Sequence, residues 1–101
     1  MIKDNAEKHR IEIWLEDQLA GFVEYHDHPT TRALLHTEVV PAYEGRGVAS
    51  ELIRQVLDDV RAEGKQVLPY CPFVRGYIGK HPEYLDLVAE DKRAEFGLGQ
   101  T

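Results

Sequence analysis

Apolar and polar residues alternate through the first forty positions of the chain, and this pattern predicts three β-strands. In the first strand Ile11, Ile13 and Leu15 share one face, and mostly polar side chains share the other. A short break at Asp17-Gln18 and a later turn separate the strands, so we expect neighbouring strands to pair antiparallel. The three expected strands span residues 9–16, 19–26 and 32–40.

Strict alternation also sorts the third strand into two faces, because successive side chains of a strand point to opposite sides of the sheet. One face is expected to carry Leu34, His36, Glu38 and Val40. The other face is expected to carry Ala33, Leu35, Thr37 and Val39.

After residue 47 the apolar residues recur with a period of 3.6, which predicts a long amphipathic helix over residues 48–63 that packs on the sheet and ends at Gly64. A fourth strand, residues 65–70, follows and is expected to run parallel to the third. Pro69 deprives this strand of one ladder N–H. The apolar helix positions are Val48, Ala49, Leu52, Ile53, Val56, Leu57 and Val60.

The last third of the chain predicts one short helix. It spans residues 72–80 and has Cys71 near its N-cap. Residues 83–88 fit either a last strand or an irregular segment. We expect one domain over residues 1–101. The segments expected to be frayed or flexible are residues 1–8 and 89–101.

The composition is that of an ordinary globular chain, with 43% of the 101 residues hydrophobic and 30% charged. No apolar run approaches the roughly 20 residues that a membrane span requires. The formal net charge of −6 disfavours nucleic acid as a partner and mildly favours a cationic amine. Because the first eight residues are too charged for a signal peptide and Cys71 is the single cysteine, we expect a cytoplasmic protein without membrane contact.

Residues 39–50 connect the third strand to the long helix through a glycine-rich loop. Gly45 and Gly47 let the loop curl so that backbone N–H groups converge, and the first N–H groups of the helix have no helical acceptors. Together with the positive end of the helix dipole, they form an anion site suited to a phosphate. An ordinary strand-to-helix turn would use the same glycines for geometry alone.

Three kinds of phosphate-binding loop compete for these residues. A Walker loop requires Lys and then Ser or Thr after its last glycine, and Val48-Ala49 stand there instead. A dinucleotide loop requires a third small residue, which Ser50 matches loosely. It also requires an acidic residue at the end of the next strand, where Tyr70-Cys71-Pro72 stand.

The third kind of loop fits best. The loop resembles the acyl-CoA signature of the GNAT superfamily of N-acetyltransferases in the residues Val39-x-Pro41-x-x-x-Gly45-x-Gly47-Val48-Ala49-x-x-Leu52. The loop core of that family, Gln/Arg-x-x-Gly-x-Gly/Ala, falls on Glu44, Gly47 and Ala49. Glu44 departs from it, and a carboxylate aimed at a pyrophosphate is repulsive. We therefore expect Glu44 to point outward and backbone N–H groups to bind.

The resemblance implies that acetyl-CoA is the cosubstrate, with its phosphates at the loop. Arg46 is the best placed cation, since it lies inside the loop. The residues expected to bind acetyl-CoA are Val39, Val40, Glu44, Gly45, Arg46, Gly47, Val48, Ala49, Ser50 and Lys80.

The resemblance also implies an α/β GNAT-like fold, with a mainly antiparallel sheet, one long helix and a parallel strand pair that splays apart around the pantetheine arm. It covers residues 10–82 as an order of elements. Most members carry two helices between their first two strands, and here Asp17-Gln18 occupies that break. The chain is therefore most similar to small, minimal single-domain members of about 100 residues, which share the segments Cys71-Pro72-Phe73-Val74 and His81-Pro82-Glu83-Tyr84.

Cys71 is the first candidate for the chemistry. It stands where many members have Asn, and a helix N-terminus favours the thiolate form of a cysteine, so it could accept the acetyl group or exchange a proton near the sulfur. A buried, inert cysteine is the alternative. The tyrosine that protonates the leaving thiolate in many members is missing, because Ile78 aligns with it. Tyr77 is the neighbouring tyrosine.

His36 and Glu38 share a strand face near the expected splay, and either could deprotonate an amine. A polar pair on the solvated side of a sheet would show the same pattern. His26 and His28 have the spacing of metal ligands but no third ligand, so we expect no metal site.

These features predict an N-acetyltransferase that transfers the acetyl group of acetyl-CoA to an amine. Without the two helices the acceptor side is expected to be open, which suits a lysine or N-terminus of a protein or peptide. A non-catalytic acyl-CoA-binding or regulatory module and a protein-interaction domain remain open as alternatives, and the pattern leaves the oligomeric state open.

Overall fold

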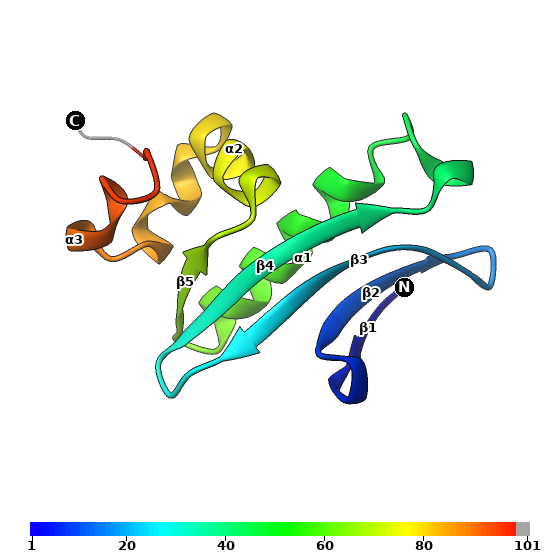
Figure 1. The fold of residues 1–101 in the computed structure, drawn as a ribbon, viewed down its shortest axis with the longest axis horizontal. Helices are drawn as coiled ribbons and strands as arrows, with labels where there is room; N and C mark the ends of the chain where they lie inside the picture. Colours follow the sequence, from blue (N-terminus) through cyan, green and yellow to red (C-terminus); the bar gives the residue numbers. More distant parts are fainter. Residues whose placement is uncertain (99–101) are drawn as a thin grey trace.

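Five strands form one sheet in the order β1-β2-β3-β4-β5, so each strand lies beside its neighbour in sequence (Figure 1). The structure is a computed structural model and describes residues 1–98. The first four strands pair antiparallel, and β4 pairs with β5 in parallel, which confirms the predicted sheet. The strands are β1 (Ile2–Asn5), β2 (Arg10–Leu15), β3 (Gln18–Asp27), β4 (Thr31–Val39) and β5 (Gln66–Pro69).

The long helix α1 packs on one face of this sheet and joins β4 to β5 (Figure 1). None of the helices within residues 1–98 is long and apolar enough to cross a membrane. The helices are α1 (Val48–Ala62), α2 (Pro72–Lys80) and α3 (Glu90–Arg93). Short 3₁₀ helices span Ala6–Lys8, Pro41–Tyr43 and Pro82–Leu87.

The hydrophobic core lies between α1 and the sheet, as the period of 3.6 predicted. Val23 of β3 and Leu34 of β4 are fully buried against it. Each large apolar side chain buried in this way stabilises the fold by about 1.5–3 kcal/mol. The buried residues of α1 are Val48, Leu52, Ile53, Val56, Leu57 and Val60.

A β-bulge interrupts the alternation of β4. In the register of β3 and β4, Glu24 pairs with His36 and Tyr25 pairs with Leu34, so Leu35 is an extra residue on β4. An extra residue reverses the face on which every later side chain of the strand lies.

The predicted faces of β4 are therefore wrong across the bulge. Thr37 pairs with the buried Val23 of β3, so Thr37 and Val39 lie on the α1 face together with Leu34. His36 and Glu38 lie on the opposite face. The prediction had grouped Leu34 with His36 and Glu38 because a bulge leaves no trace in the hydrophobic pattern.

The expectation of a frayed N-terminus is also wrong. Residues 2–5 form β1, which pairs with β2, and the amino group of Met1 donates a hydrogen bond to the Trp14 carbonyl at 2.9 Å. The polar side chains of β1 gave no apolar signal, because an edge strand of this length exposes most of them.

The segment after α2 is more ordered than the sequence indicated. Pro82–Leu87 is a 3₁₀ helix and not a strand, and the Tyr84 hydroxyl ties it to α1 by donating to Asp58 at 2.7 Å. Residues 89–98, which were expected to be flexible, contain α3, and Phe96 and Leu98 are buried. The last part of that prediction, residues 99–101, lies outside the described residues.

Glu12 is buried on the sheet face opposite α1, with 3% of its surface exposed. Its Oε2 accepts hydrogen bonds from Arg10 Nε at 2.8 Å and Asn5 Nδ2 at 3.0 Å, and its Oε1 accepts one from Trp14 Nε1 at 2.9 Å. Burial raises the pKa of Glu12, but these hydrogen bonds outweigh burial, so the pKa lies below its ordinary value of 4.5.

Glu12→Gln should destabilise the fold by about 2 kcal/mol at pH 7, because the amide turns an NH₂ group toward donors. The lowered folded-state pKa means that this contribution is complete above the unfolded pKa of 4.5 and is lost as pH falls through the folded value. Urea unfolding from pH 7 to pH 3 measures the difference between wild type and variant. The control is Glu24→Gln on neighbouring β3, whose side chain is exposed. Equal effects of the two substitutions would contradict the prediction.

Candidate functional site

The parallel pair opens where β5 ends (Figure 1). Leu34 is the last residue of β4 in register with β5, and it lies opposite Pro69, which has no N–H. The Cys71 N–H then donates to the Leu34 carbonyl at 2.9 Å as the chain turns into α2. β4 continues to Val39 with no strand beside it on this side.

The open edge of β4 presents unpaired backbone groups. The Val40 N–H donates to the Ala20 carbonyl at 2.8 Å, across the β3 side. Because backbone groups alternate in direction along a strand, those of Val39 and Thr37 point to the open edge. A ligand with amide groups can pair with them as a strand would.

The N-terminus of α1 faces the same opening. Gly45 and Gly47 have φ of +78° and +74°, in the left-handed region that the predicted curled loop requires. Gly47 is the N-cap and provides no side chain to cap the helix. The first helical bond runs from the Glu51 N–H to the Gly47 carbonyl at 3.1 Å, so the N–H groups of residues 48–50 precede it and are free to bind an anion.

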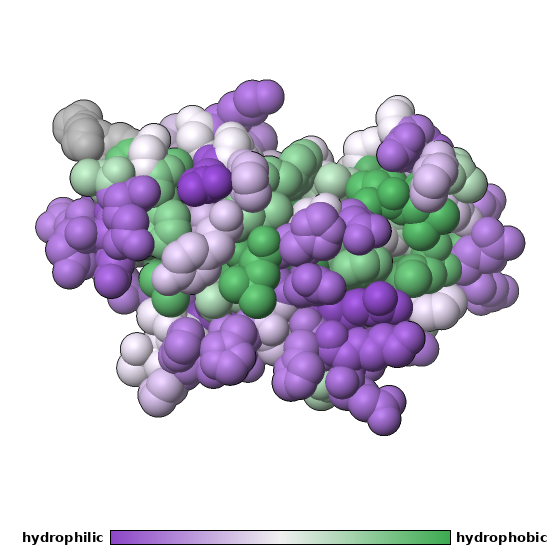
Figure 2. All heavy atoms as spheres, viewed as in Figure 1, coloured by the Kyte–Doolittle hydropathy of each residue, from purple (hydrophilic) through white to green (hydrophobic). Residues whose placement is uncertain are grey.

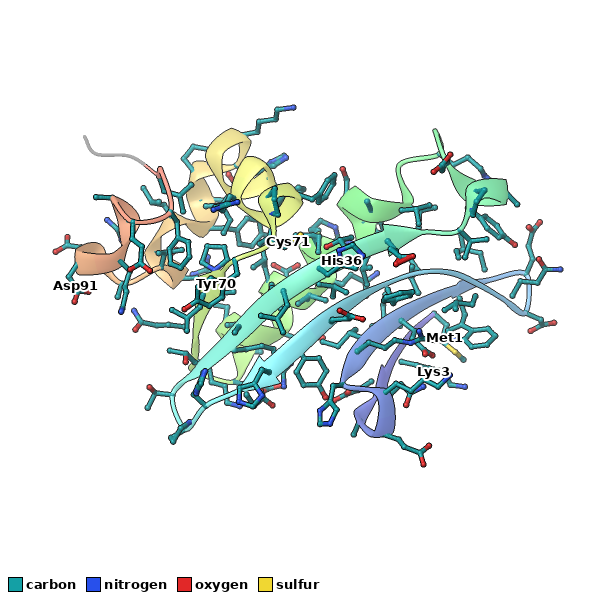
Figure 3. The ribbon with its side chains drawn as sticks, in the orientation of Figure 1. Met1, Lys3, His36, Tyr70, Cys71 and Asp91 are labelled. Atoms are coloured by element: carbon teal, nitrogen blue, oxygen red, sulfur yellow. The ribbon has the colours of Figure 1, made fainter. Side chains whose placement is uncertain are left out.

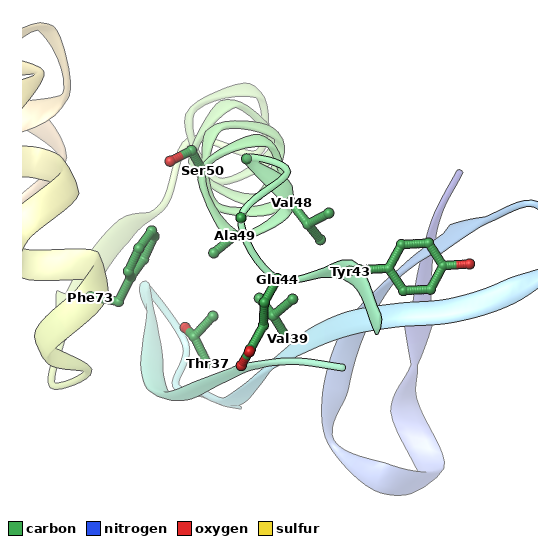
Figure 4. Close-up of a pocket in the computed structure, with 10 residues that line it drawn as sticks. Thr37, Val39, Tyr43, Glu44, Val48, Ala49, Ser50 and Phe73 are labelled. Carbon is green, nitrogen blue, oxygen red and sulfur yellow. The ribbon is translucent and has the colours of Figure 1, made fainter. Parts of the chain in front are cut away.

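A pocket of about 400 Å³ joins these two features (Figure 4). It contains seven of the ten residues predicted to bind acetyl-CoA. The seven are Val39, Glu44, Gly45, Gly47, Val48, Ala49 and Ser50.

Sequence reasoning missed three residues that line the pocket. They are Thr37, Tyr43 and Phe73. Thr37 could have been found from its spacing, since it lies two positions before Val39 and so shares its strand face. Phe73 comes from α2, and only the tertiary structure brings α2 to the pocket.

Glu44 does not point outward as predicted. Its side chain extends into the pocket, toward the wall that Thr37 and Val39 form (Figure 4). The carboxylate thus lies toward the strand side of the pocket, while the first turn of α1 forms the other side.

The other predicted cofactor residues lie outside this pocket. The Arg46 guanidinium stacks over the Tyr43 ring, 5.0 Å from its centre. Lys80 lines a second hollow of about 320 Å³, which shares Ser50 and Phe73 with the pocket. Val40 follows β4 and directs its N–H to β3.

Cys71 is the N-cap of α2, as predicted, and is 3% exposed. It does not line the pocket itself. Its Sγ lies 3.2 Å from the Thr37 Oγ1, within hydrogen-bond distance, and either atom can donate. Thr37 therefore stands between the thiol and the pocket.

His36 and Glu38 form an exposed pair on the sheet face opposite α1. The distance from His36 Nε2 to Glu38 Oε2 is 3.1 Å, and the two side chains are 54% and 57% exposed. The structure brings His36 and Glu38 together, but they lie on one face of β4 and the pocket lies on the opposite face (His36 is labelled in Figure 3).

Tyr77 lies in the second hollow and not in the pocket. Its ring stacks on His81 with 4.0 Å between ring centres, and burial raises its pKa above the ordinary value of 10.0. Ile78, at the position of the missing tyrosine, is buried in the core. Within residues 1–98 no group of three or more His, Cys, Asp or Glu side chains is arranged to hold a metal ion.

Residues 10–87 match the sequence profile of the family described as GCN5-related N-acetyl-transferase. The match spans more than half of the chain, so the chain belongs to the GCN5-related N-acetyltransferase (GNAT) family. Family and fold together support acetyl transfer as the general activity.

Individual relatives cover parts of the chain. This chain is 38% identical over 55 residues to Protein NATD1 of Gallus gallus and of Homo sapiens. These alignments cover 52% of this chain and 50% and 49% of those proteins, so the chain spans about half the length of the curated relatives it matches.

Two solved structures show the same fold. Ribosomal-protein-alanine N-acetyltransferase from Brucella melitensis biovar Abortus 2308 superposes with a TM-score of 0.57 at 21% identity, over 79% of this chain and 60% of that chain. Ard1 from Thermoplasma volcanium superposes with a TM-score of 0.52 at 19% identity, over 60% and 43%. At these identities the likeness establishes the fold.

Gly47→Glu should lower the affinity for CoA by at least about 100-fold, because it places a carboxylate at the helix N-terminus where we expect the pyrophosphate to bind. The positive φ of Gly47 adds a backbone cost of about 1–2 kcal/mol. Gly64→Glu is the matched control, since Gly64 has φ of +71° and equally open space at the far end of α1. Calorimetric titration with CoA measures both variants. Equal affinities would remove the loop from the site.

Proposed function

We propose that this protein binds acetyl-CoA in the pocket and transfers its acetyl group to an amine of another protein or a peptide. The observation that carries the proposal is that one pocket joins the N-terminus of α1 to the open edge of β4. The N–H groups of residues 48–50 suit the pyrophosphate. The backbone at the open edge suits the amide groups of the pantetheine arm, and the Val39 N–H suits the thioester oxygen.

The amine approaches from the opposite face of the sheet in this proposal. His36 and Glu38 lie on that face, beside the stretch of β4 whose other face lines the pocket. One of the two removes a proton from the amine as nitrogen attacks the thioester carbon. Cosubstrate and acceptor then meet at the open edge of β4 without competing for space.

A protein or peptide is the acceptor that this face favours. Within residues 1–98 no helix lies on this face over β1–β3, and His36 and Glu38 are 54% and 57% exposed on it, so a small molecule beside them is not enclosed. Figure 2 shows hydrophilic side chains across the middle of the face, with hydrophobic areas to either side. The net charge of −6 favours a cationic acceptor. The Brucella melitensis relative is, by its name, an acetyltransferase of a ribosomal protein.

A non-catalytic acyl-CoA-binding module is the second candidate. Two observations favour it: the Glu44 carboxylate lies in the pocket, and Ile78 stands in place of the tyrosine acid. A protein-interaction domain without a cofactor is the third candidate, and it requires the pocket to bind no CoA compound.

Acetyl-CoA at 100 times its Kd should stabilise the protein by about 2.7 kcal/mol, which raises Tm by roughly 10 °C or more in a domain of this size. Thermal denaturation with acetyl-CoA and CoA, with ATP as the control, measures the shift. A shift in Tm without thiol release in the presence of amines would support the non-catalytic acyl-CoA-binding module instead. An unchanged Tm with both CoA compounds would support the protein-interaction domain without a cofactor.

Acetyl transfer to a lysine-rich peptide should exceed transfer to a polyamine, a free amino acid or an aminoglycoside at equal concentration. The physical reason is that His36 and Glu38 are 54% and 57% exposed, so an acceptor beside them is not enclosed. Thiol release from acetyl-CoA measures each rate, and the N-acetylated form of each peptide is the control for acceptor dependence. Fast turnover of one small amine with inert peptides would disprove the acceptor class.

A further inference from the structure

Thr37 connects the buried thiol of Cys71 to the pocket. Its side chain lines the pocket on the β4 wall, and its Oγ1 lies 3.2 Å from the Cys71 Sγ. Cys71 is 3% exposed and is absent from the pocket wall. A molecule in the pocket therefore meets the Thr37 hydroxyl, and the hydroxyl in turn contacts the thiol.

The contact between Thr37 and Cys71 depends on two features of the fold. The bulge at Leu35 turns Thr37 to the α1 face of β4, and the end of the parallel ladder places Cys71 at the start of α2. Residues 37 and 71 belong to different elements, yet they meet where the strands separate.

We infer that Thr37 is a catalytic residue that donates a proton to the departing CoA sulfur, and that Cys71 replaces this proton. The inference rests on the proposed acetyl transfer and assigns its acid side. Thr37 touches the cosubstrate, and Cys71 is a positioning residue that acts through Thr37.

The step balances as follows. The amine nitrogen forms a bond to the carbonyl carbon, the C–S bond breaks, and its electron pair goes to the CoA sulfur. The Thr37 O–H proton passes to that sulfur while the Cys71 S–H proton passes to the Thr37 oxygen. The proton that the amine loses on the opposite face enters solvent. After the products leave, the Thr37 hydroxyl passes its proton back to the Cys71 thiolate and takes a proton from water in the pocket. The products are the amide and the CoA thiol.

The other groups near the site do not suit this proton transfer. Ile78 has no proton to donate, and Tyr77 lies in the second hollow. His36 and Glu38 lie on the opposite sheet face, where the amine loses its proton. The proton thus passes between two alkyl thiols, from Cys71 to CoA, through the Thr37 hydroxyl.

The same geometry argues against acetylation of Cys71 itself. An acyl-enzyme would require the thiol to reach the thioester carbon, and Thr37 lies between Cys71 and the pocket. A proton crosses this contact by moving along one hydrogen bond, whereas an acetyl group would have to displace the Thr37 side chain.

Thr37→Val removes the hydroxyl and keeps the shape of the side chain. We expect kcat for acetyl transfer to fall at least tenfold, because a positioned acid contributes to breaking the C–S bond. The Kd for CoA should stay within threefold of wild type, and Thr37→Ser should restore most of the rate because it retains a hydroxyl. A structural role alone would not produce this recovery with unchanged binding.

A double-mutant cycle tests the link to Cys71. Cys71→Ala should lower kcat by a similar factor, and the Thr37→Val, Cys71→Ala double variant should be no slower than the slower single variant. Thermal melts confirm that each variant is folded at the assay temperature. Independent losses that multiply, or a Thr37→Val variant as fast as an active wild type, would overturn the inference alone. A wild type that releases no CoA with any amine would instead overturn the proposed function, and the inference with it.

Discussion

The site depends on the early end of the ladder between β4 and β5. Pro69 has no N–H to continue the ladder, and the bond from the Cys71 N–H to the Leu34 carbonyl closes it. β4 continues alone to Val39, so its edge is open where Thr37 and Val39 line the pocket. An unpaired edge is costly unless water or a ligand satisfies it. Here the pocket lies beside the open edge, and the first turn of α1 forms its other wall.

The bulge at Leu35 divides the chemistry of β4 between the two faces of the sheet. It directs Thr37 and Val39 to the pocket and leaves His36 and Glu38 on the opposite side. Acyl transfer from a thioester to an amine requires the amine to lose a proton and the departing thiolate to gain one. Groups on opposite faces of β4 can carry out these two proton transfers without exchanging a proton with each other.

In the described part of the chain, residues 1–98, the sheet face opposite α1 is stabilised without helices over β1–β3. There Glu12 is buried among hydrogen-bond donors from β1 and β2, and the Arg10 guanidinium lies 4.3 Å from the centre of the Phe22 ring. A buried carboxylate without donors would destabilise the fold, whereas this one holds two strands in register. On the other side Arg61 of α1 binds the Asp86 carboxylate at 2.7 Å and fixes the segment after α2.

The sequence alone determined most of the framework and the glycine loop that lines the pocket. Alternation located β2, β3 and β4, the 3.6 period located α1, and Gly45 and Gly47 marked the loop, because these signals are local and repeat along the chain. It did not determine β1 or the packing of Phe96, since a polar edge strand and a short tail have no such period.

Only the tertiary structure decided how the site is completed. The bulge at Leu35 reversed the faces of β4, and the fold placed Phe73 on the pocket and Thr37 against Cys71. The direction of the Glu44 side chain into the pocket was likewise visible only in the structure. These outcomes depend on register and on contacts between elements distant in sequence, and one extra residue in a strand changes the register without changing the composition or the pattern around it.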